Sequence, residues 1–381
     1  MASFLIPFQV LFFLMLVPLQ SSIVFASLAA AAPAKEAETL LKWKASLDNK
    51  SQTLLSSWLG DSHCNWVGIT CDEAGSMTNL SLPNYVEGLR GTLHSLNFFS
   101  FPKLMNLELR NNSLYGPIPS HIGNLSKLIF LDLSYNNFSG NIPSEICLLK
   151  TTNILFRDNN LSGPIPTSIG SLHNLMRLDL GNNRLTGHIP GEVGMLRSLN
   201  YIDIAGNYLT GNIPESIGNL SKLELFYLYD NKLSGSIPSE IGQLGSLIVL
   251  QLLGNYLTGV IPPSIGNLTK LSNLLLSQNM LSGSIPREVA MLKSLSVLAL
   301  AENNFSGSIP SEIGQLESLS ILQWSDNYLT GVIPASIGNL TKLSKLVLSQ
   351  NKLSGSIPQE VGMLKSLSVL VLAGNNFSGS I

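Results

Sequence analysis

Arginine, aspartate and tyrosine recur at fixed intervals between residues 108 and 229 of this 381-residue sequence. They alternate with leucine or isoleucine, as in "RLDL" at 177–180 and "YIDI" at 201–204, so they share one face of an extended segment. Arginine and aspartate can grip charged groups or peptide termini, and tyrosine gives contact area at low entropic cost. The candidate binding residues are Glu108, Arg110, Asp132, Tyr135, Arg157, Arg177, Asp179, Tyr201, Asp203, Tyr227 and Tyr229.

Catalytic chemistry has little support in the sequence. There is no G-x-G-x-x-G loop, no H-R-D and no D-F-G, so the kinase machinery is absent from these residues. The histidines share no metal-like spacing with each other or with the cysteines. We therefore expect no catalytic residue, no cofactor and no metal in this chain. The five histidines are His63, His94, His121, His173 and His188.

The candidate binding residues lie in a repeated sequence frame, L-x-x-L-x-L-x-x-N-x-L-x-G-x-I-P, which starts at about Leu107. Its asparagine recurs every 24 residues, apart from one step of 23 between Asn136 and Asn159. A fixed period this short predicts a solenoid of leucine-rich turns rather than a set of globular domains. The asparagines are at positions 112, 136, 159, 183, 207, 231, 255, 279, 303, 327, 351 and 375.

A single turn shows what the frame builds. Leu178 and Leu180 alternate with Asp179, as a strand with one buried face requires. Asn183 follows where the chain turns inward, and its amide can satisfy backbone groups of neighbouring turns. Pro190 then stops the strand, and the rest of the turn forms the convex side as loop or short helical turn. Thirteen parallel strands about 4.8 Å apart would form an arc of roughly 60 Å.

The binding residues are expected in the first half of the solenoid. In the second half the same strand positions turn small or apolar, as at Val249, Leu275 and Val297. Residues 255–309 and 327–381 also align without gaps and differ at only eight positions. The second half therefore reads as a recent duplication of three turns, and we place no candidate residue there.

The two ends of the sequence differ from the repeats. The apolar run "FLIPFQVLFFLMLVPL" and the ending Val24-Phe25-Ala26 predict a signal peptide over residues 1–26. The alternative is an uncleaved membrane anchor. Residues 27–79 are expected to form an N-terminal cap, with "EAETLLKWKASL" helical and Trp43, Trp58 and Trp66 covering the first apolar layer; the alternative for these tryptophans is an aromatic binding site. Residues 80–381 are the repeats, with an irregular first turn and a truncated last one.

The three cysteines and the glycosylation sequons indicate an exported chain. Cys64 and Cys71, in "CNWVGITC", are close enough to pair in an oxidising compartment. Cys147 is left over; it is either a small residue tolerated in an imperfect turn or an exposed thiol for a cross-link. The candidate glycosylation sites are Asn49, Asn79, Asn111, Asn124, Asn137, Asn160, Asn219, Asn267, Asn304, Asn339 and Asn376.

The "CNWVGITC" segment and the "LSGxIPxxIGxL" turns together resemble the extracellular domain of plant leucine-rich-repeat receptor-like kinases. The resemblance covers everything after the signal peptide. It implies an α/β leucine-rich-repeat solenoid, a curved right-handed superhelix with a parallel concave sheet and a helical, disulfide-bearing N-terminal cap. Members of the family continue through a C-terminal cap, a transmembrane helix and a cytoplasmic Ser/Thr kinase, none of which is in this sequence.

The function implied by this resemblance is extracellular recognition of a ligand, most simply a peptide, in cell-surface signalling. The expected partners are a peptide or protein ligand and a leucine-rich-repeat co-receptor, on the extracellular side of the plasma membrane. A net charge of −2 shows none of the excess positive charge that nucleic-acid binding requires. Alternatives are a secreted inhibitor of cell-wall-degrading enzymes and a receptor-like scaffold or decoy without a kinase.

The last repeat, "NNFSGSI", stops one residue before the proline that follows the same letters at 303–309. We therefore expect a longer form of the protein to continue through further turns to a membrane helix and a kinase domain. Any membrane contact and any kinase activity would then belong to that continuation.

Overall fold

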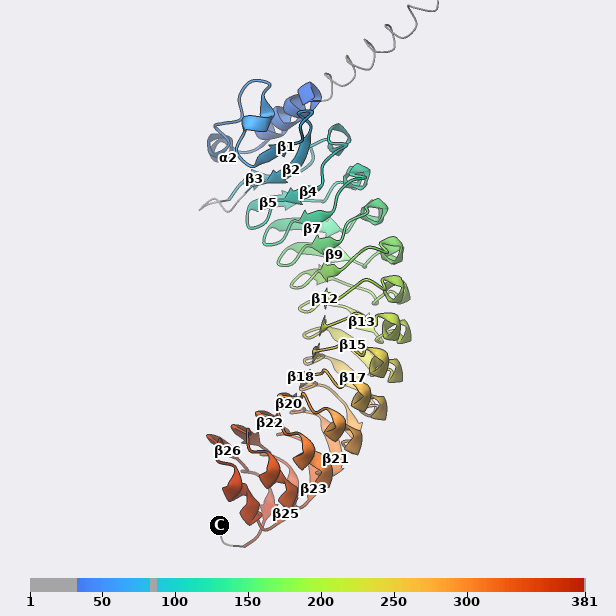
Figure 1. The fold of residues 1–381 in the computed structure, drawn as a ribbon, viewed down its shortest axis with the longest axis vertical. Helices are drawn as coiled ribbons and strands as arrows, with labels where there is room; N and C mark the ends of the chain where they lie inside the picture. Colours follow the sequence, from blue (N-terminus) through green and yellow to red (C-terminus); the bar gives the residue numbers. More distant parts are fainter. Residues whose placement is uncertain (1–32, 83–87, 380–381) are drawn as a thin grey trace, which may run out of the picture.

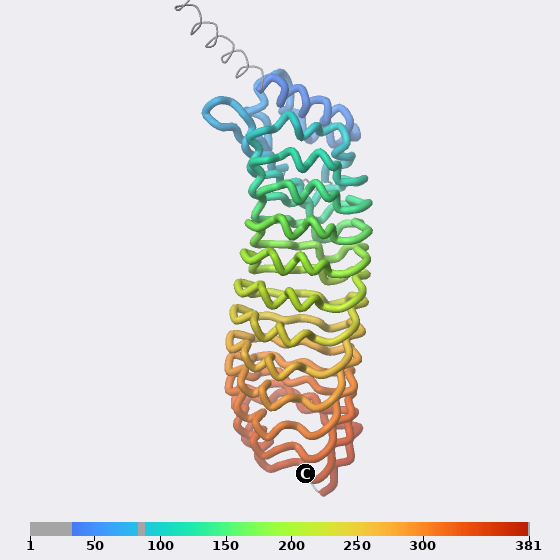
Figure 2. Tube along the Cα trace, turned by 90° about the vertical axis from the view of Figure 1, so that its right-hand side faces the viewer, coloured from blue at the N-terminus to red at the C-terminus, as the bar shows by residue number. Residues whose placement is uncertain are grey.

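The computed structural model describes residues 33–82 and 88–379, so the expected signal peptide lies outside the described residues. The chain forms a curved stack of turns, with the N-terminal cap at one end and the strands of the main sheet along the inner side of the curve (Figure 1). Turned by 90°, the turns form a regular column from the cap to the last repeat (Figure 2). No helix in the described part of the chain has the length and apolar character needed to cross a membrane.

The main sheet has fourteen strands. The first, β1, is antiparallel to β2 and belongs to the cap, while the strands from β2 onward run parallel, one per turn, as the period predicts. The strands are β1 (Ile69–Cys71), β2 (Met77–Ser81), β4 (Asn106–Glu108), β6 (Phe130–Asp132), β8 (Asn153–Leu155), β10 (Arg177–Asp179), β12 (Tyr201–Asp203), β14 (Leu225–Tyr227), β16 (Val249–Gln251), β18 (Asn273–Leu275), β20 (Val297–Ala299), β22 (Ile321–Gln323), β24 (Lys345–Val347) and β26 (Val369–Val371).

The register of this sheet aligns equivalent residues of successive turns. Arg177 pairs with Tyr201 and Leu178 with Ile202, and the same alignment holds between the other repeat strands. The middle residue of each strand from β4 to β24 is buried, as at Leu178, so the first and third residues face away from the core. Stacked turns therefore place equivalent side chains in columns along the concave face.

The repeated asparagine joins neighbouring turns, as the sequence predicts. Asn183 Nδ2 donates to Leu180 O at 3.1 Å within its own turn and to Phe156 O at 3.0 Å in the turn before. Asn183 Oδ1 accepts the N–H of Leu161 at 3.0 Å. The same pattern recurs along the stack, for example at Asn255 and Asn327. Each amide thus satisfies buried backbone groups that would otherwise lack partners.

The convex side of each turn is a short 3₁₀-helix, which from η3 onward follows an Ile-Pro step. A proline precedes each of these convex helices from η3 onward, as Pro190 does before η6. The 3₁₀-helices are η1 (His63–Asn65) in the cap, then η2 (Phe98–Ser100), η3 (Ser120–Asn124), η4 (Ser144–Leu148), η5 (Thr167–Ser171), η6 (Gly191–Met195), η7 (Glu215–Asn219), η8 (Ser239–Gln243), η9 (Pro263–Asn267), η10 (Arg287–Met291), η11 (Ser311–Gln315), η12 (Ala335–Asn339) and η13 (Gln359–Met363).

A second set of parallel strands follows the asparagines and was not predicted from the sequence. These strands form three short sheets. The first contains β3 (Arg90–Gly91), β5 (Ser113–Gly116), β7 (Asn137–Asn141), β9 (Asn160–Gly163) and β11 (Arg184–Leu185); the second contains β13 (Thr210–Gly211), β15 (Lys232–Ser236) and β17 (Tyr256–Thr258); the third contains β19 (Ser282–Gly283), β21 (Asn304–Ser308), β23 (Tyr328–Gly331), β25 (Lys352–Gly355) and β27 (Asn376–Phe377).

Cys147 is free and buried. This agrees with the interpretation of a small residue tolerated in an imperfect turn and not with that of an exposed thiol. Most turns have glycine at this position, because a Cβ on Gly242, for example, would lie 2.4 Å from Ser264 O of the next turn. After Cys147 the chain is one residue shorter, and Leu149 ends η4 in an extended conformation that the other convex helices do not show. Thr151, in a leucine position, is buried and donates to Ile129 O at 2.7 Å.

The cap has the helical and aromatic character that the sequence predicts. Residues 33–46 are helical, and α2 (Asn49–Leu54) begins at Asp48, whose side chain accepts the N–H of Ser51. The three cap tryptophans are buried against one another, with the rings of Trp58 and Trp66 stacked at 5.6 Å between centroids. Trp43 Nε1 donates to Thr92 O at 2.8 Å and ties the cap to the first turn.

The Cys64–Cys71 disulfide closes the cap loop between η1 and β1. We expect the double variant Cys64→Ala, Cys71→Ala to have a free energy of unfolding lower by about 2 kcal/mol, because without the disulfide the unfolded chain is no longer constrained. Chemical denaturation of the two proteins measures this difference. Cys147→Ala is the control, and a loss as large in that variant would show that cysteine packing, not the disulfide, is responsible.

The last described turn is less well covered than the others. All three residues of β26 are exposed, including Leu370 at 44%, whereas the equivalent Leu346 of β24 is fully buried. Leu367, Leu372 and Phe377 are only partly buried. In the described residues, no further turn packs on this apolar layer.

Candidate binding face

The candidate residues lie on the concave strands or within three residues after them. In each turn, the first and third strand residues and the residue two positions beyond the strand face away from the leucine core. In the turn of β10 these are Arg177, Asp179 and Gly181, and in the turn of β12 they are Tyr201, Asp203 and Ala205.

The three strand-end aspartates are buried, although they face away from the core. Asp132, Asp179 and Asp203 are exposed by only 3%, 6% and 3%. Each carboxylate accepts the backbone N–H two residues later, at 2.9 Å for Asp132, 3.3 Å for Asp179 and 3.0 Å for Asp203. These aspartates therefore form the floor of the face and not its exposed surface.

Arg157 extends over this floor. Its Nη1 contacts Asp203 Oδ2 and lies 4.0 Å from Asp179 Oδ1, and its Nε lies 3.2 Å from Asp158 Oδ2. Burial alone would lower the pKa of Arg157, but the Tyr229 hydroxyl and the carboxylates of Asp203 and Asp179 outweigh burial and raise it. We call Arg157, Asp179, Asp203 and Tyr229 the Arg157 cluster.

Asp179 is the carboxylate of this cluster with the weakest pairing. Its nearest guanidinium contacts, from Arg157 and Arg177, are both 4.0 Å long. Burial and the neighbouring Asp203 raise the pKa of Asp179 to about 6, against the opposing charge of Arg157. Burial also raises the pKa of Asp203, which Ala205 N–H and Arg157 partly offset.

The exposed part of the face consists of arginines supported by tyrosine rings. Arg177 lies over the ring of Tyr201, with Cζ 3.9 Å from the centroid, and Arg110 lies over Tyr135 at 5.3 Å. The rings of Tyr201 and Tyr227 are 5.8 Å apart. A guanidinium held against a ring keeps its N–H edge free to bind an acceptor.

These groups surround a hollow of about 280 Å³ on the concave face. Glu108 lies nearer the cap, where it accepts a hydrogen bond from Ser81, and Tyr227 and Tyr229 continue the face beyond the hollow. Ser134 and Leu155 were not predicted, although their strand positions follow from the same alternation. The lining residues are Arg110, Asp132, Ser134, Tyr135, Leu155, Arg157, Arg177, Asp179 and Tyr201.

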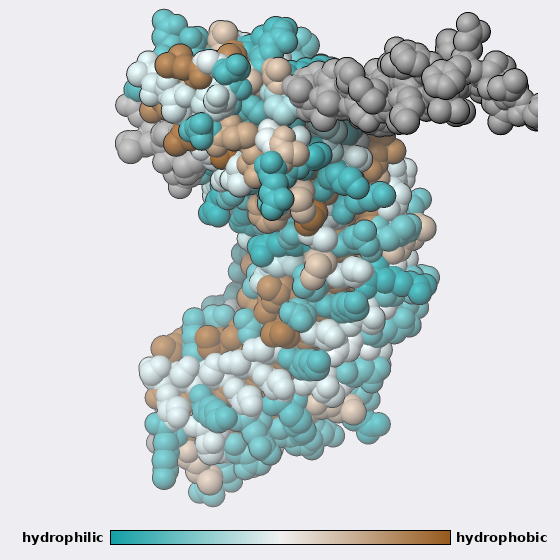
Figure 3. Space-filling model, turned by 45° about the horizontal axis from the view of Figure 1, so that its top comes forward, coloured by the Kyte–Doolittle hydropathy of each residue, from teal (hydrophilic) through white to brown (hydrophobic). Residues whose placement is uncertain are grey.

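Beyond Tyr229 the concave face changes character. From β16 to β22 its strand residues include Val249, Leu275, Val297 and Ile321 and no charged side chain. In the space-filling view, hydrophobic surface lies along the inner side of the C-terminal turns (Figure 3). Charge and aromatic rings are thus concentrated on the cap-proximal half of the face.

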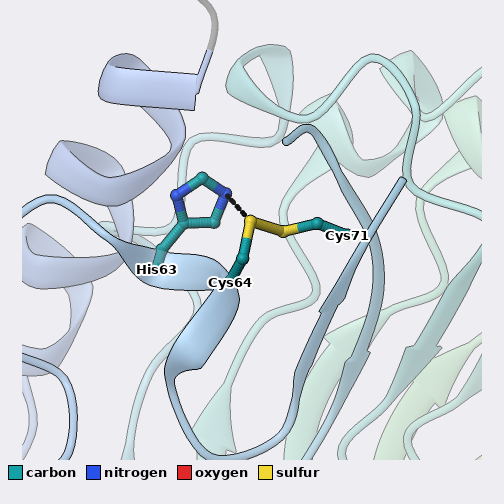
Figure 4. Close-up of side chains that lie close together, drawn as sticks. All are labelled: His63, Cys64 and Cys71. Atoms are coloured by element: carbon teal, nitrogen blue, oxygen red, sulfur yellow. Dashed lines mark hydrogen bonds between the residues drawn. A yellow bond between two sulfur atoms is a disulfide. The ribbon is translucent and has the colours of Figure 1, made fainter. Parts of the chain in front are cut away.

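A cluster in the cap resembles a metal site by distance alone. The donor atoms of His63, Cys64 and Cys71 lie within 4.8 Å of one another. Both sulfurs, however, are bonded to each other in the disulfide (Figure 4), and His63 Nε2 is 2.9 Å from the buried carboxylate of Glu36. Cysteine binds zinc as its thiolate, so Cys64 and Cys71 in their disulfide form offer no such ligand, and these residues do not fit a metal.

None of the eleven sequon asparagines is buried. Asn79 and Asn160 are half-buried and the other nine are exposed, several of them on the convex helices, as at Asn219 and Asn267. Their glycosylation stays a prediction, which this exposure permits.

Most of the sequence matches known families of leucine-rich repeats and their N-terminal domain. Residues 33–72 match the leucine rich repeat N-terminal domain. Residues 263–379 match a leucine-rich repeat region and residues 149–209 a leucine rich repeat. Single repeats match at 103–125, 127–149, 222–244 and 246–268.

Individual relatives are similar to this chain over part of their length. The leucine-rich repeat receptor-like serine/threonine-protein kinase RGI4 of Arabidopsis thaliana is 41% identical over 109 residues, which cover 28% of this chain and 10% of that protein. The crystal structure of PEPR1-AtPEP1 is similar at 37% identity and a TM-score of 0.79, over 90% of this chain and 52% of that one. The plant peptide hormone receptor RGFR1 in complex with RGF2 is similar at 34% identity and a TM-score of 0.64, over 84% of this chain and 57% of that one.

Proposed function

Because this chain belongs to the leucine-rich-repeat proteins, with plant receptor-like kinases among its relatives, we propose that it is the extracellular recognition domain of such a receptor. Its ligand is an extended peptide that binds along the concave face between Glu108 and Tyr229. The observation that carries this proposal is the hollow between the ring-supported arginines Arg110 and Arg177.

The geometry of the face suits an extended chain. Successive strands are about 4.8 Å apart, so a ligand running across them meets a new set of side chains in each turn. Arg110 and Arg177 offer free N–H edges to carboxylates or carbonyls, and Tyr201 and Tyr227 offer ring surface. One similar structure is that of the plant peptide hormone receptor RGFR1 in complex with RGF2, and this supports a peptide as the class of ligand.

The remaining roles follow from the same proposal. Residues 1–26 serve as the signal peptide, residues 27–79 as the cap and residues 80–381 as the repeats, with the chain outside the cell. The chain catalyses nothing itself, and kinase activity belongs to a longer form. A leucine-rich-repeat co-receptor is a further proposed partner.

Peptide capture tests this proposal. We expect the immobilised protein without its signal peptide (residues 27–381), incubated with peptides from plant extracellular fluid, to retain a peptide that mass spectrometry identifies. A synthetic copy of that peptide should bind at least tenfold more weakly after Arg110→Ala, Arg177→Ala and Tyr201→Ala are combined, because buried aromatic and arginine contacts dominate binding energy.

The matched control is the combination of Arg197→Ala, Arg287→Ala and Tyr256→Ala, which removes the same side-chain types from exposed positions away from the hollow. Equal loss of affinity in both triple variants would place the binding site elsewhere. Retention of a cell-wall-degrading enzyme and no peptide would favour an inhibitor.

A further inference from the structure

Gly181 lies in the path by which Arg157 reaches Asp203. It occupies the position two residues beyond β10, between the turn that carries Arg157 and the turn that carries Asp203. A Cβ on Gly181 would lie 2.7 Å from Arg157 Nη1 and 3.0 Å from Asp203 Oδ1. The guanidinium therefore fills the space that a side chain at position 181 would need.

The neighbouring turns keep the same path open. The equivalent position holds Arg157 in the turn of β8, Gly181 in the turn of β10, Ala205 in the turn of β12 and Tyr229 in the turn of β14. Two small residues thus separate Arg157 from Tyr229, and the guanidinium spans the intervening turn to interact with Asp203 and the Tyr229 hydroxyl.

The Arg157 guanidinium is already paired inside the protein. It contacts three carboxylates, from Asp158, Asp179 and Asp203, and its side chain is only 22% exposed. The guanidiniums of Arg110 and Arg177 differ, because Arg110 has no ion pair among the described residues and Arg177 has one at 4.0 Å. A ligand would have to break the Arg157 cluster in order to use Arg157 directly.

A chain of contacts leads from Arg157 to the exposed wall of the hollow. Arg157 contacts Asp203, and Asp203 Oδ2 accepts from the Tyr201 hydroxyl at 3.5 Å. The Tyr201 ring in turn supports Arg177 at 3.9 Å. Asp203 also has its other oxygen fixed by Ala205 N–H. The position of Arg177 therefore depends on groups that Arg157 holds.

We propose that Arg157 is a positioning residue, which holds Asp203 and thereby the Tyr201–Arg177 pair in place, and that Gly181 is the residue that permits this bridge. Arg157 then shapes the binding face without touching the ligand. This inference rests on the proposed function in one respect: Tyr201 and Arg177, which Arg157 positions, are taken to bind the peptide.

Gly181→Ala tests the bridge without removing any charged or aromatic group. The new methyl would meet the far ends of two side chains, one of them the flexible Arg157, and not backbone, so the guanidinium moves and the fold stays. Gly245→Ala is the matched control, since no atom lies within 4 Å of a Cβ placed there. Both glycines lack the positive φ that would strain an alanine.

The first measurement uses the free protein. With ¹³C-labelled aspartate, we expect Asp179 and Asp203 to titrate at higher pH in Gly181→Ala than in the unmodified protein, because the Arg157 charge that opposes their protonation has moved away. Arg157→Ala should give a shift in the same direction, and Gly245→Ala none. An unchanged titration in Gly181→Ala would overturn the bridge.

The second measurement uses the synthetic copy of the captured peptide. Gly181→Ala should weaken its binding at least fivefold, and Gly245→Ala should leave it unchanged. A shifted titration with unchanged affinity would overturn the positioning role. Failure to capture any peptide would count against the proposed function, while the titration still decides whether the bridge exists.

Discussion

Replacing Asn207 by alanine is expected to lower the free energy of unfolding by about 3 kcal/mol, because the two N–H donors and the oxygen of its amide lose their buried backbone partners at once. Asn207 Nδ2 donates to Leu180 O, Ile204 O and Ala205 O at 3.0–3.2 Å. Its Oδ1 accepts Leu185 N–H at 2.9 Å. These groups have no access to water, since Asn207 is only 5% exposed, and alanine offers them no partner.

The bonds of Asn207 also join two turns, so the loss falls on the interface from which a solenoid draws its stability. Urea denaturation followed by circular dichroism measures the change. Asn212→Ala is the control: Asn212 is exposed, and its amide makes one long bond, to Ile213 O at 3.4 Å. Similar losses in the two variants would show that the repeated asparagine has no special role in stability.

Much of the fold could be predicted because every turn repeats the same signals. Leu178 and Asn183 recur in kind at each step, and a period of 24 residues leaves one way to stack the turns. The second set of strands could not be predicted in this way. A strand such as Thr210–Gly211 has two residues and no apolar alternation, and it exists only because neighbouring turns align its backbone with the strand beside it.

The sequence predicted which residues lie on the concave face, but not how deeply each of them is buried there. Alternation assigned Asp179 and Asp203 to the concave face, but it could not show that both are buried. Their burial depends on Arg157, which lies over them, and on Gly181, whose lack of a side chain makes room for it. Such an arrangement involves residues from different turns, and a reading of one turn at a time does not bring them together.

The stability of the protein should depend on pH through Asp179. Its pKa in the folded protein is about 6, whereas an aspartate in an unfolded chain has a pKa of about 3.9. Between these two values the folded state binds more protons than the unfolded state, so this group makes the protein more stable as the pH falls from 7 to 4. The expected contribution is about 2 kcal/mol, and burial beside Asp203 is its cause.

Other carboxylates also titrate in this range, so the contribution of Asp179 is isolated by comparison with Asp179→Asn, which has no proton to bind at this position. The free energy of unfolding of the unmodified protein, minus that of the variant, should be about 2 kcal/mol more favourable at pH 4 than at pH 7. Asp61→Asn, which removes an exposed carboxylate of the cap, controls for the loss of one charge. A difference that stays constant with pH, or that changes in the opposite direction, would mean that Arg157 and Arg177 hold Asp179 ionised throughout, and that its carboxylate is paired more closely in solution than the 4.0 Å contacts indicate.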